Sequence, residues 1–158
     1  MLERIDQSNY ATFDTLVQDY EHEFAPVTGK TKNQDGLYAL DSSWKSPYQG
    51  YYWRIGNDFV GFVIMQVKDS LGDIAEFYVV PSSRRNRVGE AMAHAVFDMQ
   101  PGRWQVRQVE GADKAKAFWR RVIVRYTSSK YTESVVDDPD WGMVTRQQFE
   151  SRKVESKK

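Results

Sequence analysis

Short segments rich in apolar and aromatic residues dominate the middle and the end of the chain, and they predict β-strands. Three of these segments follow one another between residues 50 and 80, separated only by brief turns such as Gly56-Asn57-Asp58. Turns this short favour an antiparallel meander. The predicted strands cover residues 2–5, 50–55, 59–67, 74–80, 104–109, 131–136 and 142–149.

Three other segments place their apolar residues at the spacing of an amphipathic helix. The first follows Ser8, which is expected to cap it, and its apolar positions run from Tyr10 to Tyr20. The second covers residues 88–99. The third runs from a predicted cap at Asp113 to about residue 125.

The order of these elements predicts a single domain over residues 1–150, of the α/β (α+β) class. A helix between the strands at 74–80 and 104–109 is expected to be a right-handed crossover, which makes those two strands parallel. Residues 24–49 lack clear periodicity except for a suggested helical turn at 37–40. A loop of this length inside a compact domain is often functional.

Composition narrows the class of protein further. With 158 residues, 41% of them hydrophobic, the chain can bury one core, and it contains no apolar run long enough to span a bilayer. It has no cysteine and only two histidines, which lie far apart, so disulfides, a thiolate nucleophile and a structural zinc site are not expected. We expect a soluble, cytoplasmic protein without a metal, and a disordered charged tail at residues 151–158.

The net charge is zero, which gives no overall attraction to nucleic acid or membranes. The distribution is uneven, because residues 1–50 carry eight acidic and four basic side chains. An acidic front and a basic remainder suit a cationic acceptor and an anionic cofactor. Ordinary scatter of surface charge explains the asymmetry equally well.

A basic loop connects the strand at 74–80 with the helix at 88–99. A helix leaves its first backbone N–H groups unpaired and carries a partial positive charge at that end, so phosphate binds there readily. Arg84, Arg85 and Arg87 add charge-assisted donors beside this helix end. The pattern suits an anion-binding cradle, although the basic run by itself equally suits a solvated turn that caps an ordinary helix.

Written as Arg84-x-x-Arg87-x-Gly89, the loop resembles the acetyl-CoA loop of the GNAT N-acetyltransferase superfamily, whose pattern is Gln/Arg-x-x-Gly-x-Gly/Ala. Residues 110–123 resemble the next helix of that superfamily, normally Asn-x-x-Ala-x-x-Phe-Tyr. With their flanking strands, the two blocks cover roughly residues 51–149. Three positions depart from the patterns: Arg87 replaces the first glycine, Ala112 the asparagine and Trp119 the tyrosine.

The resemblance implies a mixed, mostly antiparallel central sheet with one splayed pair of parallel strands and helices on both faces. It also implies that acetyl-CoA binds between the splayed strands, with its pantetheine as a pseudo-strand and its pyrophosphate on the loop. The implied cofactor-binding residues are Phe77, Tyr78 and Val79 on the strand, Arg84, Arg85, Asn86, Arg87, Val88, Gly89, Glu90 and Ala91 in the loop and helix start, and Lys114 and Phe118 in the next helix.

Glu76 is the predicted general base. It lies among apolar residues of a central strand, where partial desolvation raises the pKa of a carboxyl group. In GNAT enzymes an acidic residue at the corresponding strand position often receives the amine proton. A solvated glutamate on an open sheet face, or an ion pair with a neighbouring arginine, is the structural alternative.

The general acid and the acceptor residues are less clearly marked. Trp119 stands where many GNAT enzymes have the acidic tyrosine, and an indole N–H does not supply a proton at useful pH. Tyr126 is the candidate catalytic acid and Tyr131 a second, although both residues also suit packing roles. The candidate acceptor-binding residues are His22, Tyr51 and Trp53.

Two functions remain open from the sequence. The first is an N-acetyltransferase that moves an acetyl group from acetyl-CoA directly to a primary amine of a small molecule or a protein, in a ternary complex. The second is a non-catalytic acyl-CoA-binding sensor or regulatory module of the same fold, favoured by the missing tyrosine and asparagine. In either case we expect a monomer or homodimer with no nucleic-acid or membrane partner.

Overall fold

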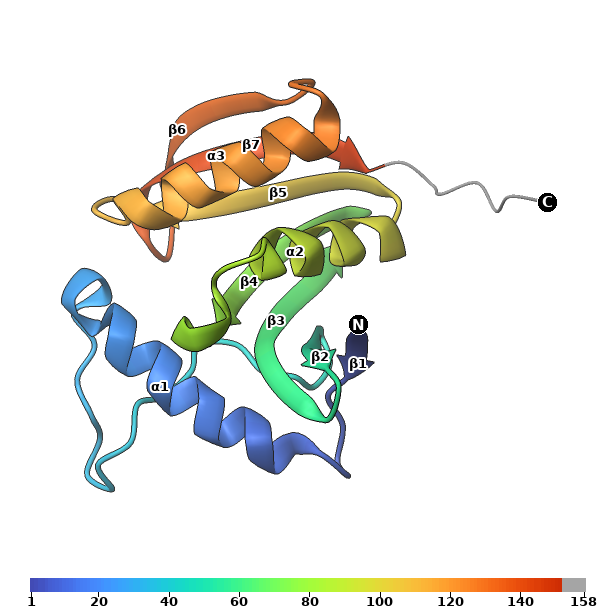
Figure 1. Ribbon diagram of the computed structural model, residues 1–158. Coiled ribbons are helices and arrows are strands. Elements are labelled where there is room, and N and C mark those ends of the chain that lie inside the picture. The colour runs from blue at the N-terminus through green and yellow to red at the C-terminus, as the bar shows by residue number, and fades with distance from the viewer. Residues whose placement is uncertain (152–158) are drawn as a thin grey trace. The chain divides into compact units, whose positions relative to one another are not determined.

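The computed structural model describes residues 1–151. Figure 1 shows its elements. The strands are β1 (Leu2–Arg4), β2 (Tyr48–Ile55), β3 (Asp58–Lys68), β4 (Leu71–Val79), β5 (Gly102–Val109), β6 (Thr132–Asp138) and β7 (Gly142–Ser151), and the helices are α1 (Tyr10–Thr28), the 3₁₀ turn η1 (Pro81–Ser83), α2 (Val88–Met99) and α3 (Asp113–Thr127). Of the predicted tail at 151–158, Ser151 ends β7 with its side chain buried, and the rest lies outside the described residues.

The strands form one mixed sheet in the order β1-β2-β3-β4-β5-β7-β6. The β1–β2, β2–β3, β5–β7 and β6–β7 pairs are antiparallel. β4 and β5 pair in parallel, with Leu71 opposite Arg103 and Asp73 opposite Gln105. The mixed, mostly antiparallel sheet with one parallel pair is therefore confirmed, and so is the crossover through α2.

The chain groups into two compact units. The first contains Met1–Gln66 and Ala75–Met92, and the second contains Val67–Ile74 and the residues from Ala93 on. β3, β4 and α2 each contribute to both. A single domain over residues 1–150 stays a prediction.

In the first unit, helices cover both faces of the sheet. Phe13 and Leu16 of α1 pack in one buried cluster with Phe62 of β3. On the other face, a Cβ at Gly61 would lie 3.4 Å from the Cε of Met92 in α2 and 2.5 Å from the carbonyl oxygen of Tyr78. Glycine at this position therefore lets the backbone of β4 and the start of α2 approach β3 closely.

In the second unit, α3 packs against β5 and β7. Trp104 of β5 is fully buried, and the ring of Phe97 in α2 meets it edge-on with centroids 5.2 Å apart. A Cβ at Gly72 would lie 2.7 Å from the Trp104 ring, so the indole requires glycine there. Trp119 of α3 is also buried.

Several predicted details of the helices and their caps were wrong. Asn9 is the N-cap of α1, and the Ser8 hydroxyl donates instead to Asp6 at 2.6 Å. The helix continues through Pro26 to Thr28, because apolar contacts beyond Tyr20 keep it on the core. The expected helical turn at 37–40 is irregular backbone, and Asp113 lies inside the first turn of α3 rather than capping it. No helix among the described residues is long and apolar enough to cross a membrane.

Candidate active site

Glu76 lies on β4 in the first unit and is only 8% exposed. The hydroxyl of Tyr20, on α1, donates a hydrogen bond to its Oε2. The hydroxyl of Ser42, from the loop at 29–47, is 3.5 Å from Oε1. The Tyr20 ring packs edge-on against Tyr78, two residues along β4, with centroids 5.7 Å apart. Since alternate strand residues share a face, Glu76 and Tyr78 both face α1.

Burial is the main influence on the ionisation of these groups. It raises the pKa of Glu76 to about 7, although the Tyr20 hydrogen bond and the charge of Lys30 work in the opposite direction. Burial, together with the nearby Glu76 charge, raises the pKa of Tyr20 well above its usual range. Tyr20 is therefore a stable donor at neutral pH, while Glu76 exchanges its proton in that range.

An ionic group beside this pair ties the loop at 29–47 to α1. Lys30 contacts buried Glu21 at 3.0 Å and exposed Asp41 at 3.1 Å, and it donates to the carbonyl of Ala39 at 3.1 Å. These contacts hold the loop segment that carries Ser42. The structural alternative of an ion pair between Glu76 and an arginine is not what the structure has at Oε2, where the donor is a phenol.

After β4 the chain passes through η1 to Arg84, whose guanidinium is already engaged. Its Nε donates to the carbonyl of Val79 at 2.9 Å, and its Nη2 donates to both oxygens of Glu23 at 2.7 and 2.8 Å. The guanidinium also lies 5.6 Å from the centroid of the Tyr78 ring. Arg84 thus ties the end of β4 to α1, which the sequence did not indicate.

The start of α2 has the backbone geometry of an anion cradle. Asn86 and Arg87 take left-handed conformations, with φ of 64° and 59°, and turn the chain into the helix. The amide of Ala91 bonds to the Arg87 carbonyl at 3.0 Å, so the amides of the preceding turn point out of the helix end. Arg85 and Arg87 are exposed beside it, with Arg87 3.9 Å from Glu90. A donor set of amides and arginines fits a pyrophosphate such as that of coenzyme A.

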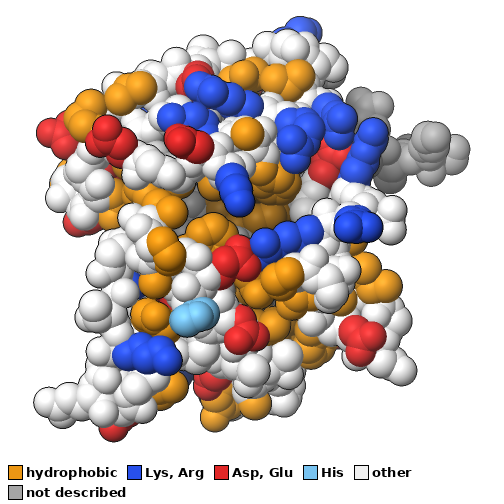
Figure 2. All heavy atoms as spheres, turned by 60° about the vertical axis from the view of Figure 1, so that its left-hand side comes forward, with side chains coloured by type: hydrophobic (Ala, Val, Ile, Leu, Met, Phe, Trp, Pro, Cys, Tyr) orange, Lys and Arg blue, Asp and Glu red, His pale blue; other side chains and the backbone are white. Residues whose placement is uncertain are grey.

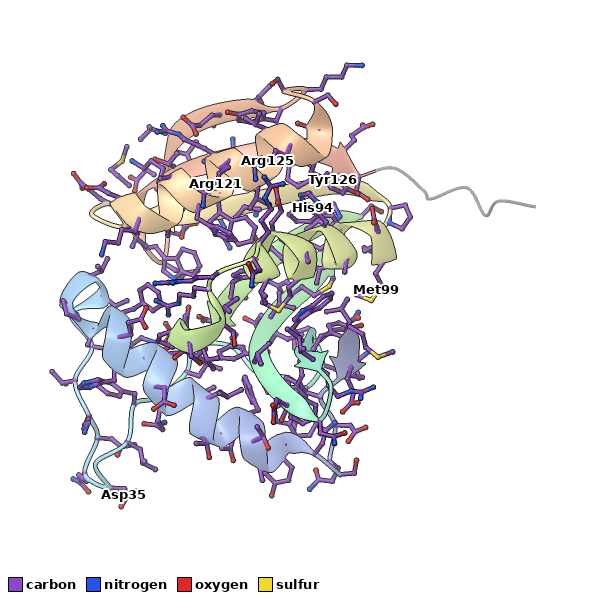
Figure 3. All side chains as sticks on the ribbon, viewed as in Figure 1. Asp35, His94, Met99, Arg121, Arg125 and Tyr126 are labelled. Atoms are coloured by element: carbon purple, nitrogen blue, oxygen red, sulfur yellow. The ribbon has the colours of Figure 1, made fainter. Side chains whose placement is uncertain are left out.

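The second unit holds three of the predicted residues, Lys114, Phe118 and Tyr126. Lys114 is exposed and Phe118 half-buried on α3, a helix over which basic side chains gather (Figure 2). Tyr126 donates its hydroxyl to Asp98 at 2.7 Å and packs edge-on against the Phe97 ring, 5.1 Å between centroids (Figure 3). The cofactor role of Lys114 and Phe118 and the acid role of Tyr126 stay predictions.

The predicted acceptor residues are not gathered around Glu76. Tyr51 pairs with Val63 on β3, whereas its neighbour Tyr52 belongs to the core cluster under α1, so Tyr51 and Trp53 project from the opposite face of β2. Tyr51 instead donates to Gln49 at 2.8 Å and receives a hydrogen bond from Arg4 at 3.3 Å. His22 is exposed on α1. Their binding roles remain untested.

Neither a protein-family model nor a curated protein matches the amino-acid sequence. Solved structures do match. An aminoglycoside 6′-N-acetyltransferase complexed with coenzyme A aligns with a TM-score of 0.67 at 9% identity, over 99% of each chain. The PaiA N-acetyltransferase from Thermoplasma acidophilum, in complex with coenzyme A, aligns with a TM-score of 0.66 at 7% identity, over 94% of this chain and 98% of that chain.

A ribosomal-protein-alanine N-acetyltransferase from Escherichia coli aligns with a TM-score of 0.61 at 12% identity, over 98% of this chain and 96% of that one. The chain has the GNAT acetyltransferase fold. The resemblance seen in two short sequence blocks is thereby confirmed for the fold. At identities this low, the likeness says nothing further about activity or substrate.

The GNAT fold explains one departure of the sequence from the family pattern. Arg87 stands where the first glycine of the loop is usual, and its φ of 59° is the left-handed conformation that glycine adopts without strain. Here a non-glycine residue adopts that conformation at a penalty of about 1 kcal/mol. The exposed arginine side chain brings an extra cation to the helix end.

Tyr20 and Ser42 are the residues near Glu76 that sequence reasoning missed. Tyr20 belongs to the apolar side of α1, so the sequence predicts only a buried packing role for it. Nothing in the helical spacing shows that its hydroxyl reaches a carboxylate. Ser42 lies in a segment without periodicity, where no pattern predicts a partner. Only the fold brings both groups to Glu76.

Proposed function

We propose that the protein is an N-acetyltransferase that moves an acetyl group from acetyl-CoA to a primary amine by direct transfer in a ternary complex. The observation that carries the proposal is the buried Glu76 carboxylate, whose pKa of about 7 matches the task of a general base at neutral pH. The GNAT fold and the amide cradle at the start of α2 support the choice of cofactor.

In this mechanism the chain supplies the base and the positioning groups. Tyr20 holds Oε2 of Glu76, so Oε1, on the side of Ser42, accepts a proton from the acceptor's ammonium group. The neutral nitrogen then forms a bond to the acetyl carbon as the carbon–sulfur bond breaks, the nitrogen gives up its second proton to solvent, and the departing thiolate takes a proton. Acetyl-CoA supplies the activated acetyl group as a thioester. The amides and arginines at the start of α2 bind its pyrophosphate.

The source of the thiolate's proton is the open step. Tyr126 is the sequence-based candidate, and its hydroxyl is engaged by Asp98. A coenzyme A thiol is a good leaving group, so solvent water suffices as the proton source in the absence of a dedicated acid. Replacing Tyr126 with phenylalanine separates the two cases, because only an acid role predicts a loss of turnover with unchanged cofactor affinity.

The function is tested by measuring thiol release from acetyl-CoA with a panel of primary amines. Glu76→Gln should lower turnover on the order of a hundredfold, the usual range for a positioned base, while coenzyme A affinity stays as in the wild type. Glu150→Gln, at an exposed site in β7, is the matched control and should keep full activity.

Two results would count against the proposal. A Glu76→Gln enzyme as fast as the wild type would remove the glutamate from the mechanism. Tight coenzyme A binding without thiol release for any amine would favour the non-catalytic sensor instead.

A further inference from the structure

A cavity of about 680 Å³ lies in the first unit between α1 and the loop at 29–47. Phe13 and Val17 of α1 form part of its apolar lining. Tyr38, Leu40 and Trp44 of the loop contribute the facing side. Its volume falls within the range of small-molecule pockets, which combine an apolar lining with a few polar groups.

The charged side chains that line this cavity are all acidic. They are Asp14 and Asp19, and both are exposed on the same helix. Lysines of the chain already lie beside two aromatic rings of the lining, Lys45 at 5.2 Å from the centroid of Trp44 and Lys32 at 5.8 Å from that of Tyr38, so the preference for a cationic ligand rests on the two carboxylates. A cavity with aromatic walls and two carboxylates favours a ligand with an apolar stem and a positive charge.

The cavity borders the Glu76 carboxylate through Ser42. Ser42 lines the cavity, and its hydroxyl is 3.5 Å from Oε1, the oxygen that Tyr20 leaves free. Asp19 directly precedes Tyr20 in α1, and Asp14 lies six residues before Tyr20. At the helical rise per residue, six residues span ~9 Å. A ligand with its reacting nitrogen at Oε1 that extends along α1 therefore passes Asp19 first and has Asp14 at its far end.

Hydrogen bonds hold the loop side of the cavity in place. The Gln18 side chain donates to the Tyr38 carbonyl at 3.0 Å and accepts from the Tyr38 amide at 2.8 Å. Together with the Lys30 contacts to Glu21 and Asp41, this reciprocal pair fixes both ends of the segment. A pocket formed before the ligand arrives binds without a further ordering penalty.

We propose that this cavity is the acceptor pocket, and that it selects amines carrying a second positive charge at the end of an apolar stem. The proposal rests on the acetyl-transfer function above and names its acceptor class. Glu76 serves the reacting nitrogen, Asp14 binds the far cation, and Asp19 adds negative charge along the pocket between them. Acceptors with a carboxylate at that end are excluded by repulsion.

Three amines of equal length test the selection: 1,4-diaminobutane, n-butylamine and 4-aminobutanoate, whose far ends are positive, neutral and negative. The expected order of kcat/KM follows that sequence, with the diamine about tenfold or more above butylamine, because charge-assisted contacts favour it. The preference should shrink at high salt. Equal values for the diamine and 4-aminobutanoate would overturn the proposal.

Variants locate the effect in the cavity. Asp14→Asn and Asp19→Asn should each raise the KM for the diamine several-fold and leave that for butylamine unchanged. Asp35→Asn is the control. It also removes one negative charge, but from the outer end of the loop at 29–47, where Asp35 points away from α1 (Figure 3), so the KM values for the diamine and for butylamine should not change. Equal effects of all three variants would mean a general charge effect and would overturn the assignment.

A binding measurement separates this proposal from the acetyl-transfer function. Titration of the free protein with 1,4-diaminobutane, followed by the indole N–H resonance of Trp44, should saturate, and Asp19→Asn should weaken the binding. If no amine is acetylated but this titration behaves as expected, the transfer function fails and the cation pocket stands. If the diamine does not bind, the pocket is wrong whatever the outcome of the activity screen.

Discussion

Two buried carboxylates of β4, Asp73 and Glu76, lie three residues apart in the chain and have different partners. Asp73, in the second unit, accepts a hydrogen bond from the guanidinium of Arg107 at 2.8 Å. The same guanidinium donates to Asp138 at 2.6 Å. Glu76, in the first unit, accepts from the neutral hydroxyl of Tyr20. One carboxylate is paired with a cation and the other is not.

The partners decide how each site ionises. The pKa of Asp138 is lowered although burial pushes it upward, because the Asp140 amide and Arg107 stabilise its charged form. The pKa of Glu76 is raised to about 7 because a phenol offsets only part of the burial. A carboxylate held by a cation stays ionised and fixes structure, whereas one held by a phenol is left able to exchange a proton. This difference is the one expected between a carboxylate that serves structure and one that serves as the proposed base.

The largest expected effect comes from removing Arg107, the cation that pairs with Asp73 and Asp138. Arg107→Ala leaves two carboxylates with side chains 7% and 9% exposed without their cation, and it removes the guanidinium from above the Trp141 ring. We expect a loss of about 3 to 5 kcal/mol in the free energy of unfolding at pH 7, measured by urea denaturation. Arg103→Ala, at an exposed position on the same strand, should change it by less than about 0.5 kcal/mol. Equal effects of the two variants would show that the contacts of Arg107 with Asp73 and Asp138 do not contribute to the free energy of unfolding.

The second prediction is that removing the charge of Glu76 stabilises the protein, whereas removing Arg107 destabilises it. In the folded protein the pKa of Glu76, about 7, exceeds its ordinary value of 4.5, so the folded state binds the proton more tightly than the unfolded state does. The ionisation penalty is absent below pH 4.5, grows between 4.5 and 7, and is complete above that. Glu76→Gln should therefore stabilise the protein by up to about 3 kcal/mol above pH 7 and add little at pH 4.

Urea denaturation of the wild type and Glu76→Gln across this pH range checks the result, with exposed Glu150→Gln as a control that should follow the wild type. A gain in stability with a loss of turnover is the expected signature of a site strained for function. A stability difference that does not change with pH would place the pKa of Glu76 near its ordinary value.

The features of the fold that depend on local sequence patterns could be predicted, whereas the contacts between distant residues could not. Strand and helix periods depend on local alternation, so the meander, the crossover and the span of α2 were predictable from the sequence. Glu76 was marked because it is the one carboxylate in the apolar strand predicted at 74–80. Its partner was not marked, because Tyr20 is 56 residues away in the chain and its helical position predicts only burial.

In the loop before α2, the sequence predicted the charge of the residues but not their partners. Its basic residues predicted an anion site, but Arg84 binds Glu23, a contact between residues 61 apart that no local pattern contains. The end of α1 was also missed, because Pro26 and the polar residues around it resemble a loop. Tertiary contacts decided each of these positions.

The last and smallest effect tests the phenol itself. Tyr20→Phe keeps the ring but removes the hydrogen bond that favours ionised Glu76, so the pKa of Glu76 should rise further, by about one unit for a charged hydrogen bond. The rate of acetyl transfer should fall several-fold at pH 7 and recover at higher pH, with the midpoint of the pH–rate profile displaced upward. Direct carbon NMR titration of Glu76 should show the same displacement. Tyr10→Phe, at the exposed start of the same helix, is the control and should leave both curves in place. A loss of activity that persists at high pH, with an unchanged Glu76 titration, would mean that Tyr20 acts through packing rather than through its hydroxyl.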